Sequence, residues 1–382
     1  MIYLDNAATS YKKPDSVLRA VCEATYKNSA NPGRAGHDLS IKSGEILYNA
    51  RKKLSELLNI ENPDRITFCQ NTTEALNKGI KGVMAVGGHM ITTTMEHNSV
   101  IRPINVLKNE KGVTCSHLKA DENGEIDVEK LEQMIRRDTK LIVMTHSSNV
   151  CGNIYNIKRA SQIARENNVL FMVDGAQSVG SVPIDANMCD LLAFPGHKGL
   201  MGPMGTGGLY VKEGVKIKTI IEGGTGSVSE SLTQPEFFPD MLESGTMNVP
   251  GIAGLGAAAE FIMKNGAEQI GNYERELRER FEEKIKNMKN IKIYGGKNKC
   301  GICAFNIDGI DCVEVAQKLN DDFGICVRSG LHCAYVAHRS LGTDKTGVVR
   351  MSFGFFNTKS DADIAADAIY KISDNSKMFT NM

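Results

Sequence analysis

An aspartate and a lysine stand at points of the chain where a folded protein can use them for chemistry. Asp174 comes at the end of the apolar run "VLFMVDG" (169–175), and Lys198 lies in the glycine-rich stretch "GHKGLMGPMGTGG". A carboxylate at the end of a buried strand needs a cation or strong donors, because burying it alone is costly. A desolvated lysine has a lowered pKa and becomes a nucleophile that forms Schiff bases. The plain alternative for Lys198 is an ordinary surface-loop residue.

A possible anion site follows the run "RITFCQ" (65–70). Thr72 and Thr73 come directly after it, where a helix is expected to begin. Hydroxyls and free N–H groups at a helix N-terminus bind anions such as phosphate. The alternative is a capping box, in which Thr72, Thr73 and Glu74 simply start the helix.

Together these groups are the set that a pyridoxal 5'-phosphate (PLP) site requires. The cofactor needs a lysine for covalent attachment, an aspartate for its pyridinium nitrogen and an anion site for its phosphate. His97 could supply a planar group against the ring, although His97 and Asn149 taken singly are as readily a structural histidine and a turn residue. Asp174 and Lys198 lie two dozen residues apart with an apolar run between them, which fits neighbouring strands of one sheet.

The elements that must position these residues follow an α/β pattern from about residue 14 to 250. Short apolar runs, read as buried strands, alternate with segments of helical periodicity such as 127–137 and 157–168. This alternation predicts βαβ units and a mostly parallel sheet, with ligands bound at the carboxyl ends of its strands. The predicted strands are 65–70, 89–94, 140–146, 169–175, 190–196 and 207–212.

The pattern changes after about residue 250. We expect one long charged helix from about 255 to 289, followed by a smaller α+β domain. We therefore predict a large PLP-binding domain of residues 14–248. Residues 1–13 and 249–382 form the small domain, which carries the loop that contains Cys333. Within the small domain we expect strands at 291–295, 302–308, 325–330 and 348–358, a helix at 312–324 and a terminal helix.

The composition of the 382 residues excludes several classes of protein. Lys and Arg number 45 and Asp and Glu also number 45, so neither nucleic acid nor an anionic membrane is an expected partner. No run reaches the ~18 apolar residues of a membrane span, and nothing resembles a signal peptide. The ten cysteines are scattered, which favours a reducing cytoplasm. Cys300-x-x-Cys303 has no second pair, so we expect two strand residues there and no metal site.

At this point the chain resembles a known family, the PLP-dependent cysteine desulfurases and selenocysteine lyases of the class V aminotransferase group. The resemblance rests on "YLDNAATS", "NTTEALN", "MEHNS", "SNVCGN", "VDGAQSVG", "GHKGLMGP", "ESGTMNVPG", "RSGLHC" and "VRMSFGFFNT", in the family's order. It implies PLP fold type I, with a mostly parallel seven-stranded sheet flanked by helices and a smaller α+β domain. The form "RSGLHC" and the short run from Cys333 to Arg350 are similar to the second group of desulfurases.

The resemblance implies a role for each cofactor-binding residue. Lys198 would hold PLP covalently and move protons at the substrate Cα, while Asp174 would pair with the pyridinium nitrogen. Gln177 would hydrogen-bond the ring hydroxyl, and His97 would stack on the ring and assist proton transfer. The phosphate would be bound by Thr72, Thr73 and His197, and by Thr246 from the neighbouring subunit of a homodimer.

The resemblance also implies how the substrate is used. Asn149 and Arg350 would clamp its carboxylate, Arg350 as a bidentate fork, and Arg328 would lie near the entrance. Cys333 would accept sulfur from L-cysteine, or selenium from L-selenocysteine, leaving L-alanine and a persulfide for an acceptor protein. Nearby His332 and Arg328 would favour the thiolate, on a loop expected to be mobile.

Two positions depart from the family, and two alternatives remain. Pro195 stands where many relatives have a phosphate-binding serine, and Leu331 replaces a frequent histidine. One alternative is a class V aminotransferase or another PLP lyase that does not use Cys333. The other is a non-catalytic sulfur carrier or metal-binding scaffold built on Cys333, His332 and His338.

Overall fold

The computed structural model describes residues 1–32 and 36–379. Residues 33–35 and 380–382 belong to the two predicted domains and lie outside the described chain. No helix within the described ranges has the length and apolar content needed to cross a membrane.

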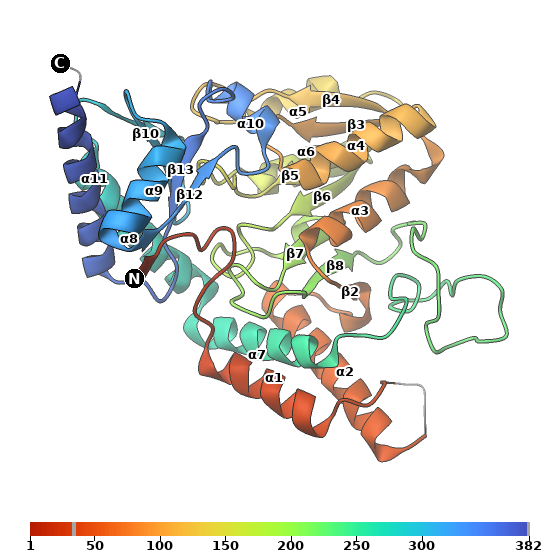
Figure 1. Ribbon diagram of the computed structural model, residues 1–382. Coiled ribbons are helices and arrows are strands. Elements are labelled where there is room, and N and C mark those ends of the chain that lie inside the picture. Colours follow the sequence, from red (N-terminus) through yellow and green to blue (C-terminus); the bar gives the residue numbers. More distant parts are fainter. Residues whose placement is uncertain (33–35, 380–382) are drawn as a thin grey trace.

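A seven-stranded sheet forms the centre of the larger part of the molecule (Figure 1). Its order is β2-β8-β7-β6-β5-β3-β4; the five strands β3 to β7 are parallel, and β8 runs antiparallel to both of its neighbours. This confirms the predicted α/β fold with a mostly parallel sheet. The strands are β2 (Ile66–Cys69), β3 (His89–Thr93), β4 (Thr114–Leu118), β5 (Thr139–Thr145), β6 (Leu170–Asp174), β7 (Leu191–Pro195) and β8 (Gly207–Val211).

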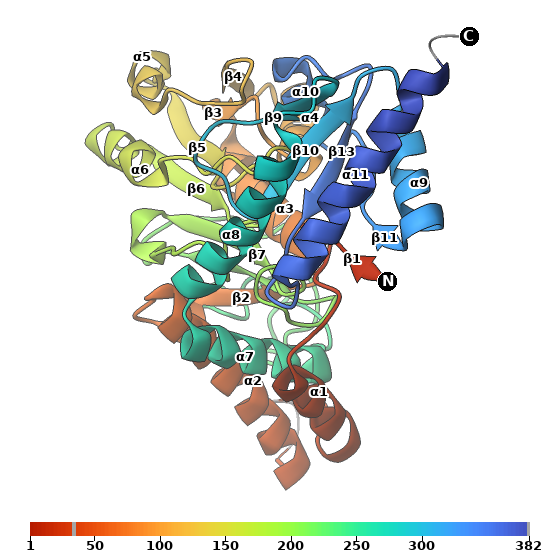
Figure 2. The same ribbon diagram turned by 90° about the vertical axis from the view of Figure 1, so that its left-hand side faces the viewer.

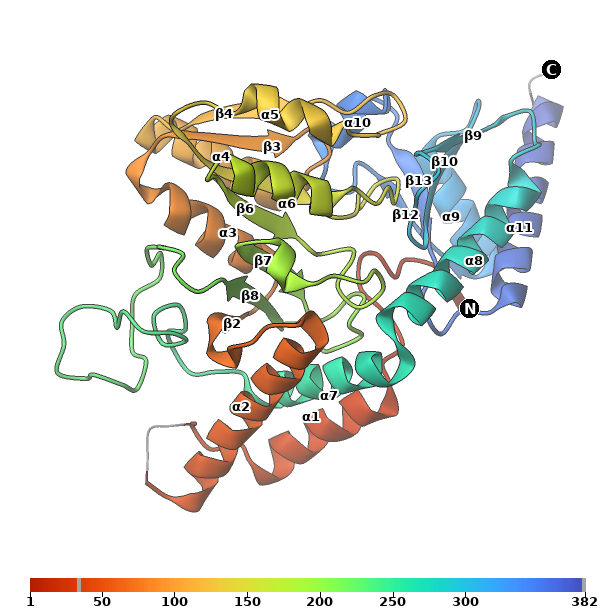
Figure 3. The ribbon, with the colours of Figure 1, turned by 180° about the vertical axis from the view of Figure 1, so that it is seen from behind.

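Helices cover both faces of this sheet, because its strands carry apolar side chains on both sides. One face packs against α3 (Thr72–Val83) and α4 (Asn98–Lys111). The opposite face, seen in Figure 3, packs against α2 (Asp38–Leu58), α6 (Ile157–Glu166) and α7 (Val249–Asn265). Helix α1 (Asp15–Lys27) lies outside, against α7. The remaining short helices here are η1 (Pro63–Arg65), η2 (Met84–Val86), η3 (Val128–Lys130), α5 (Leu131–Met134) and η4 (Ala186–Met188).

A second core lies beside the large sheet. It is built on a four-stranded sheet of order β12-β13-β10-β9 and on three helices. The N-terminal strand β1 pairs in parallel with β11, far along the chain, as Figure 2 shows. Its elements are β1 (Ile2–Tyr3), β9 (Ile291–Tyr294), β10 (Ile302–Ile307), β11 (Ile325–Cys326), β12 (Arg328–Gly330), β13 (Val348–Ser352), α8 (Ala267–Ile285), α9 (Cys312–Phe323) and α11 (Lys359–Phe379). The short helix α10 (Tyr335–Ser340) follows β12 and packs its Ala337 into the core of the large sheet.

Some predicted elements were wrong. The single helix expected over 255–289 is two helices, α7 and α8, that meet at Gly266 with φ +79°. The helix expected over 127–137 shrinks to η3 and α5, and the strand expected over 325–330 divides into β11 and β12 of different sheets. The domain boundary at residue 249 stays a prediction, and α7 beyond it packs on α1 and α2.

Candidate active site

One cavity collects side chains from the carboxyl ends of several strands of the large sheet. They come from the turns and helix starts that follow β2, β3, β5, β6 and β7. Most of the predicted site residues therefore face one space, where open α/β sheets bind ligands. The predicted residues among its lining are Thr72, Thr73, His97, Asn149, Asp174, Gln177, His197 and Lys198.

Asp174 and Lys198 provide the two opposite charges of this cavity. Asp174 ends β6 and is 2% exposed, and its Oδ1 accepts a hydrogen bond from the Ala176 N–H at 2.9 Å. Burial raises the pKa of Asp174, and the cation of Lys198 opposes that shift. Burial also lowers the pKa of Lys198 to about 8, and the nearby charges of Arg350 and Arg328 act in the same direction.

The backbone around Lys198 is held by a close approach of two turns. Gly180 has φ +103°, and a Cβ at this position would lie 2.3 Å from the carbonyl carbon of Gly199. Only glycine allows the turn after β6 to pack so closely on the lysine loop. Within that loop the Met201 N–H donates to the carbonyl of Lys198 at 2.8 Å. The packing of these two turns therefore fixes the backbone position of the lysine.

The N-terminus of α3 is capped by residues other than the two threonines. The Asn71 side chain accepts from the Glu74 N–H at 3.0 Å, and the Glu74 carboxylate accepts from the Gln70 N–H at 2.7 Å. The expected capping box of Thr72, Thr73 and Glu74 is wrong, since Asn71 is the capping residue. This arrangement leaves the N-terminal end of α3, with both threonines, facing the cavity.

His97 caps α4 and is tied to the same anion-binding end. Its Nδ1 accepts from the Ser99 N–H at 3.0 Å, so the neutral ring carries its proton on Nε2. The Ser99 hydroxyl lies 2.8 Å from His97 Nδ1 and 2.8 Å from Thr73 Oγ1. Burial, helped by the charge of Lys198, lowers the pKa of His97 to about 4. The sequence reading did not identify Ser99, although it stands two residues after His97.

His197 has an unused ring nitrogen toward the same end of the cavity. Its Nδ1 is buried and has no hydrogen-bond partner among the described residues. Burial, with the charges of Lys198 and Lys13, lowers the pKa of His197 to about 4, so the ring is neutral at pH 7. The carbonyl of His197 accepts from the Ser10 N–H at 2.9 Å and from Lys13 Nζ at 3.2 Å. The N-terminal segment therefore supports this histidine.

Cys333 lies beside the cavity in a turn with unusual backbone angles. His332 and Cys333 have φ of 48° and 55°, the left-handed region that glycine favours. Two hydrogen bonds hold this turn: the carbonyl of His332 accepts from Asn149 Nδ2 at 2.7 Å, and the carbonyl of Cys333 accepts from the Asn98 N–H at 2.8 Å. The residues between β12 and α10 form a short turn, and the Cys333 side chain is exposed. That this loop moves during the reaction stays a prediction.

The cation at this thiol is Arg328. Its Nη2 lies 3.8 Å from Cys333 Sγ. His332 cannot supply charge, because burial first and the positive charge of Arg350 next lower its pKa to about 2. The prediction that His332 favours the thiolate stays a prediction, and such a role would not come from a positive charge on its ring. His332 stacks on His338 at a centroid distance of 5.9 Å, and both rings are buried.

Arg350 connects the cavity wall with the N-terminal segment, although it does not itself line the cavity. It lies on β13 and is 1% exposed. Its Nη1 donates to the carbonyl of Asn149 at 2.8 Å, and its Nη2 donates to Asp5 Oδ1 at 2.8 Å. Burial lowers the pKa of Arg350, and Asp5 opposes that shift. Asp5 was missed, although it follows a short apolar run as Asp174 does.

Three other predicted positions lie apart from the cavity. Thr246 is exposed and does not line the cavity of its own chain. Pro195 ends β7 opposite Gly207, and Leu331 is 38% exposed. At the cysteine pair, Cys303 is a core residue of β10, and Cys300 Sγ accepts from the Ser147 hydroxyl at 3.5 Å. No three His, Cys, Asp or Glu side chains of the described chain are grouped so that they could hold a metal ion.

The residues of the cavity fit PLP. A carboxylate lies buried at a strand end, and a lysine with a lowered pKa stands near it. At the other end, a helix N-terminus, two threonine hydroxyls and an unpartnered buried imidazole nitrogen make a donor set for a phosphate.

Comparison with known proteins agrees with this chemistry. The family model described as Aminotransferase class-V matches residues 2–364. A probable cysteine desulfurase from Methanothermobacter thermautotrophicus is 35% identical over 381 residues, 97% of this chain and 94% of that protein. A cysteine desulfurase from Salmonella dublin is 33% identical over 375 residues, 95% of this chain and 91% of that protein.

Solved structures give the same result at the level of the fold. The apo structure of a cysteine desulfurase from Thermococcus onnurineus has a TM-score of 0.90 at 30% identity, covering 98% of this chain and 95% of that one. A cysteine desulfurase from Escherichia coli has a TM-score of 0.87 at 28% identity, covering 99% and 94%. The chain therefore belongs to the class V aminotransferase family and, within it, to the PLP-dependent cysteine desulfurases.

Proposed function

We propose that this protein removes sulfur from L-cysteine and transfers it to Cys333, with L-alanine as the other product. The observation that carries the proposal is the position of Cys333. Its exposed thiol stands on a turn that is hydrogen-bonded to Asn149 of the cavity wall and to Asn98, which follows His97. A class V enzyme that did not use this thiol would have no need of two left-handed residues there.

The residues that line the cavity would hold the cofactor. Lys198 would attach PLP, Asp174 would pair with its pyridine nitrogen, His97 would stack on its ring and Gln177 would hydrogen-bond its hydroxyl. Thr72, Thr73 and His197 would bind the phosphate at the N-terminus of α3. When bound, PLP supplies an electron sink for the bonds at the substrate Cα.

The protein's own side chains bind the substrate and move its protons. Arg350 and Asn149 bind the substrate carboxylate. Arg350 does so with the N–H groups that are not already donated to Asp5 and to the carbonyl of Asn149. Lys198 takes the Cα proton; burial lowers its pKa to about 8, which favours the uncharged amine that can accept this proton. His97 is neutral and carries its proton on Nε2, where it can donate.

Sulfur transfer is then a displacement at the substrate sulfur. The thiolate of Cys333 forms the new S–S bond as the S–Cβ bond of the substrate breaks. The electron pair of that bond stays with the carbon skeleton, which takes up one proton at Cβ, regains the Cα proton from Lys198 and leaves as L-alanine. Arg328, 3.8 Å from Sγ, stabilises the charge on the attacking sulfur. The persulfide on Cys333 faces solvent, where an acceptor protein can take the terminal sulfur; L-selenocysteine would react in the same way.

The functional unit is a homodimer in which Thr246 completes the phosphate site of the neighbouring subunit. Thr246 is exposed and does not line its own chain's cavity. Helices α1 and α2 offer an apolar surface for such a partner. Its exposed side chains are Leu18, Tyr26, Leu39, Ile41 and Tyr48, each more than half exposed.

Two variants test the proposal. Cys333→Ser should abolish alanine formation from cysteine while leaving cofactor binding unchanged. In the wild type, mass spectrometry after one turnover should find one added sulfur atom on the Cys333 peptide. Lys198→Ala should lose the absorption of covalently bound cofactor. Unchanged alanine formation in Cys333→Ser would mean a class V lyase or aminotransferase without a persulfide. Bound zinc and no chromophore in the wild type would mean a scaffold.

A further inference from the structure

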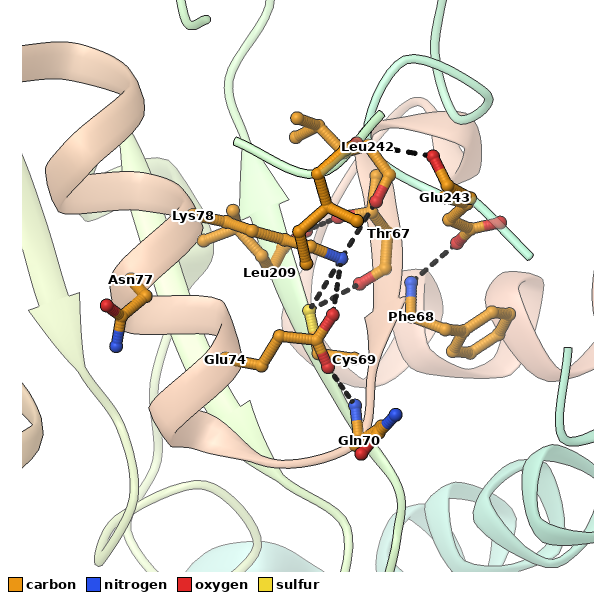
Figure 4. A network of polar contacts seen from close by, with 12 residues as sticks. Thr67, Phe68, Cys69, Gln70, Glu74, Asn77, Lys78, Leu209, Leu242 and Glu243 are labelled. Carbon is orange, nitrogen blue, oxygen red and sulfur yellow. Dashed lines mark hydrogen bonds and ion pairs between the residues drawn. The ribbon is translucent and has the colours of Figure 1, made fainter. Parts of the chain in front are cut away.

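A buried polar cluster fixes the chain just before Thr246 (Figure 4). Glu243 is its centre: Arg51 Nη1 and Nη2 of α2 donate to its two carboxylate oxygens at 2.8 and 3.0 Å. The N–H of Phe68 in β2 also donates to this carboxylate, at 2.5 Å. The side chains of Arg51 and Glu243 are 5% and 8% exposed. A bidentate pair this buried holds its backbone firmly, since breaking it leaves an unpaired charge.

The third support comes from α3, the helix whose N-terminus faces the cofactor cavity. Lys78 Nζ donates to the carbonyl of Leu242 at 2.8 Å and lies 2.7 Å from Glu74 Oε1. Figure 4 shows Lys78 reaching from its helix toward Leu242, with Glu243 on the far side facing Phe68. We call Arg51, Lys78 and Glu243 the clamp. It ties residues 242–243 to α2, β2 and α3 together.

The chain beyond the clamp is short and is fixed again at its other end. Gly245 has φ +89°, and its N–H donates to the carbonyl of Gly224 at 2.8 Å. Asn248 caps α7, accepting from the Gly251 N–H at 3.0 Å. Thr246 stands between these fixed points with an exposed side chain. A residue that is held on both sides, is exposed and does not line its own chain's cavity is suited to serve a second chain.

We infer that the clamp positions Thr246 for the phosphate group bound in the partner subunit. This inference rests on the proposed sharing of Thr246 between subunits. Arg51, Lys78 and Glu243 are positioning residues: none of them lines the cofactor cavity of its own chain. The clamp connects α2, β2 and α3 to residues 242–243. One set of contacts therefore orders the segment containing Thr246, which each chain would contribute to the phosphate site of the other.

Mixed dimers can separate an effect on the partner from a local effect. One chain carries Lys198→Ala and the other keeps Lys198, and two different tags isolate the mixed species. Borohydride reduction then traps PLP only on the chain with Lys198. The dissociation constant of PLP at that one site is measured by titration, with pyridoxal, which lacks the phosphate, as a parallel probe. Glu243→Gln is placed either on the chain with Lys198 or on the chain without it.

Glu243→Gln on the chain without Lys198 should raise the PLP dissociation constant of the other chain at least about tenfold, as for a lost bond to a charged group. Placed on the chain with Lys198, Glu243→Gln should change the PLP dissociation constant of that chain less than about twofold. The dissociation constant of pyridoxal should stay unchanged whichever chain carries Glu243→Gln. The double variant Arg51→Met with Glu243→Met guards against misfolding, because apolar side chains of similar volume often replace a buried pair without loss of stability. On the chain without Lys198, this double variant should also raise the PLP dissociation constant of the other chain.

Thr246→Val on the chain without Lys198 distinguishes the two ways in which the reasoning can fail. If this variant weakens PLP binding and the clamp variants do not, the shared threonine stands and the clamp inference is wrong. If Thr246→Val has no effect across the dimer, the shared site itself is wrong. Equal effects of Glu243→Gln on both chains would show a general loss of structure and would also overturn the inference.

Discussion

Glu96 is a carboxyl group that the fold buries completely, immediately before His97. Its Oε1 accepts from Thr93 Oγ1 at 2.6 Å and from the Thr145 N–H at 3.0 Å, while Oε2 has no partner among the described residues. Burial raises the pKa of Glu96 from 4.5 to about 8, the two hydrogen bonds oppose this shift, and the charge of Asp174 adds to it. Glu96 is therefore protonated at pH 7 in the folded chain, and Glu96→Gln imitates that state.

The raised pKa fixes the sign of a pH effect on stability. Between the unfolded pKa of 4.5 and the folded value of about 8, only the unfolded chain releases this proton. The free energy of unfolding consequently falls as pH rises through this window, by about 1.4 kcal/mol for each pH unit. From about pH 5.5 to about pH 7.5 the glutamate should remove roughly 3 kcal/mol of stability, to the order of magnitude.

The assay is urea unfolding of wild type and Glu96→Gln at both pH values, with the same protein and cofactor concentrations throughout. Relative to wild type, Glu96→Gln should gain about 3 kcal/mol between the lower and the higher pH. Glu122→Gln, at an exposed position, is the matched control and should follow wild type. If wild type and Glu96→Gln lose stability in parallel, Glu96 is already ionised in the folded protein and the reasoning is refuted.

Two further predictions concern the backbone near the site. Asn149→Ala removes the donor to the His332 carbonyl, at a cost of about 1–3 kcal/mol. Hydrogen exchange of the Asn98 amide, which binds the same turn, should accelerate at least about fivefold, and unchanged exchange would mean that the turn does not depend on Asn149. Gly180→Ala should destabilise the protein by about 3 kcal/mol in urea unfolding, since its Cβ would meet the lysine loop at 2.3 Å. Gly309→Ala, also at positive φ but with open space around its Cβ, should cost clearly less, and equal losses would contradict the packing argument.

Much of the fold could be predicted because the large sheet is buried on both faces. Its central strands are continuous apolar runs, for example "LFMVD" of β6, and such runs are visible in a sequence. The missed strand β4, "TCSHL", lies at the edge of the sheet with only its last residue fully buried. The break at Gly266 was also missed, since a single glycine inside a charged helical pattern does not show whether the helix continues.

The site was predictable where it follows strand ends and unpredictable where it depends on distant contacts. Asp174, His97 and Lys198 each stand just after an apolar run, so the topology of parallel strands brings them together. The pairing of Arg350 with Asp5 joins residues 345 apart in the chain. The left-handed turn at Cys333 likewise depends on Asn149 from the other side of the site, which local sequence does not report.

The distribution of charge in the site explains why these distant contacts matter. Burial keeps His97 and His197 neutral at pH 7, so both rings offer hydrogen bonds without charge. The nearby cations are therefore Lys198, Arg328 and Arg350. The charges of the two arginines contribute to the lowered pKa of Lys198, and the charge of Arg328 contributes to the lowered pKa of Arg350. Arg350 keeps its charge at this depth because Asp5 lies against it. Through that one contact, the N-terminal segment keeps a buried positive charge beside Asn149 of the cavity wall.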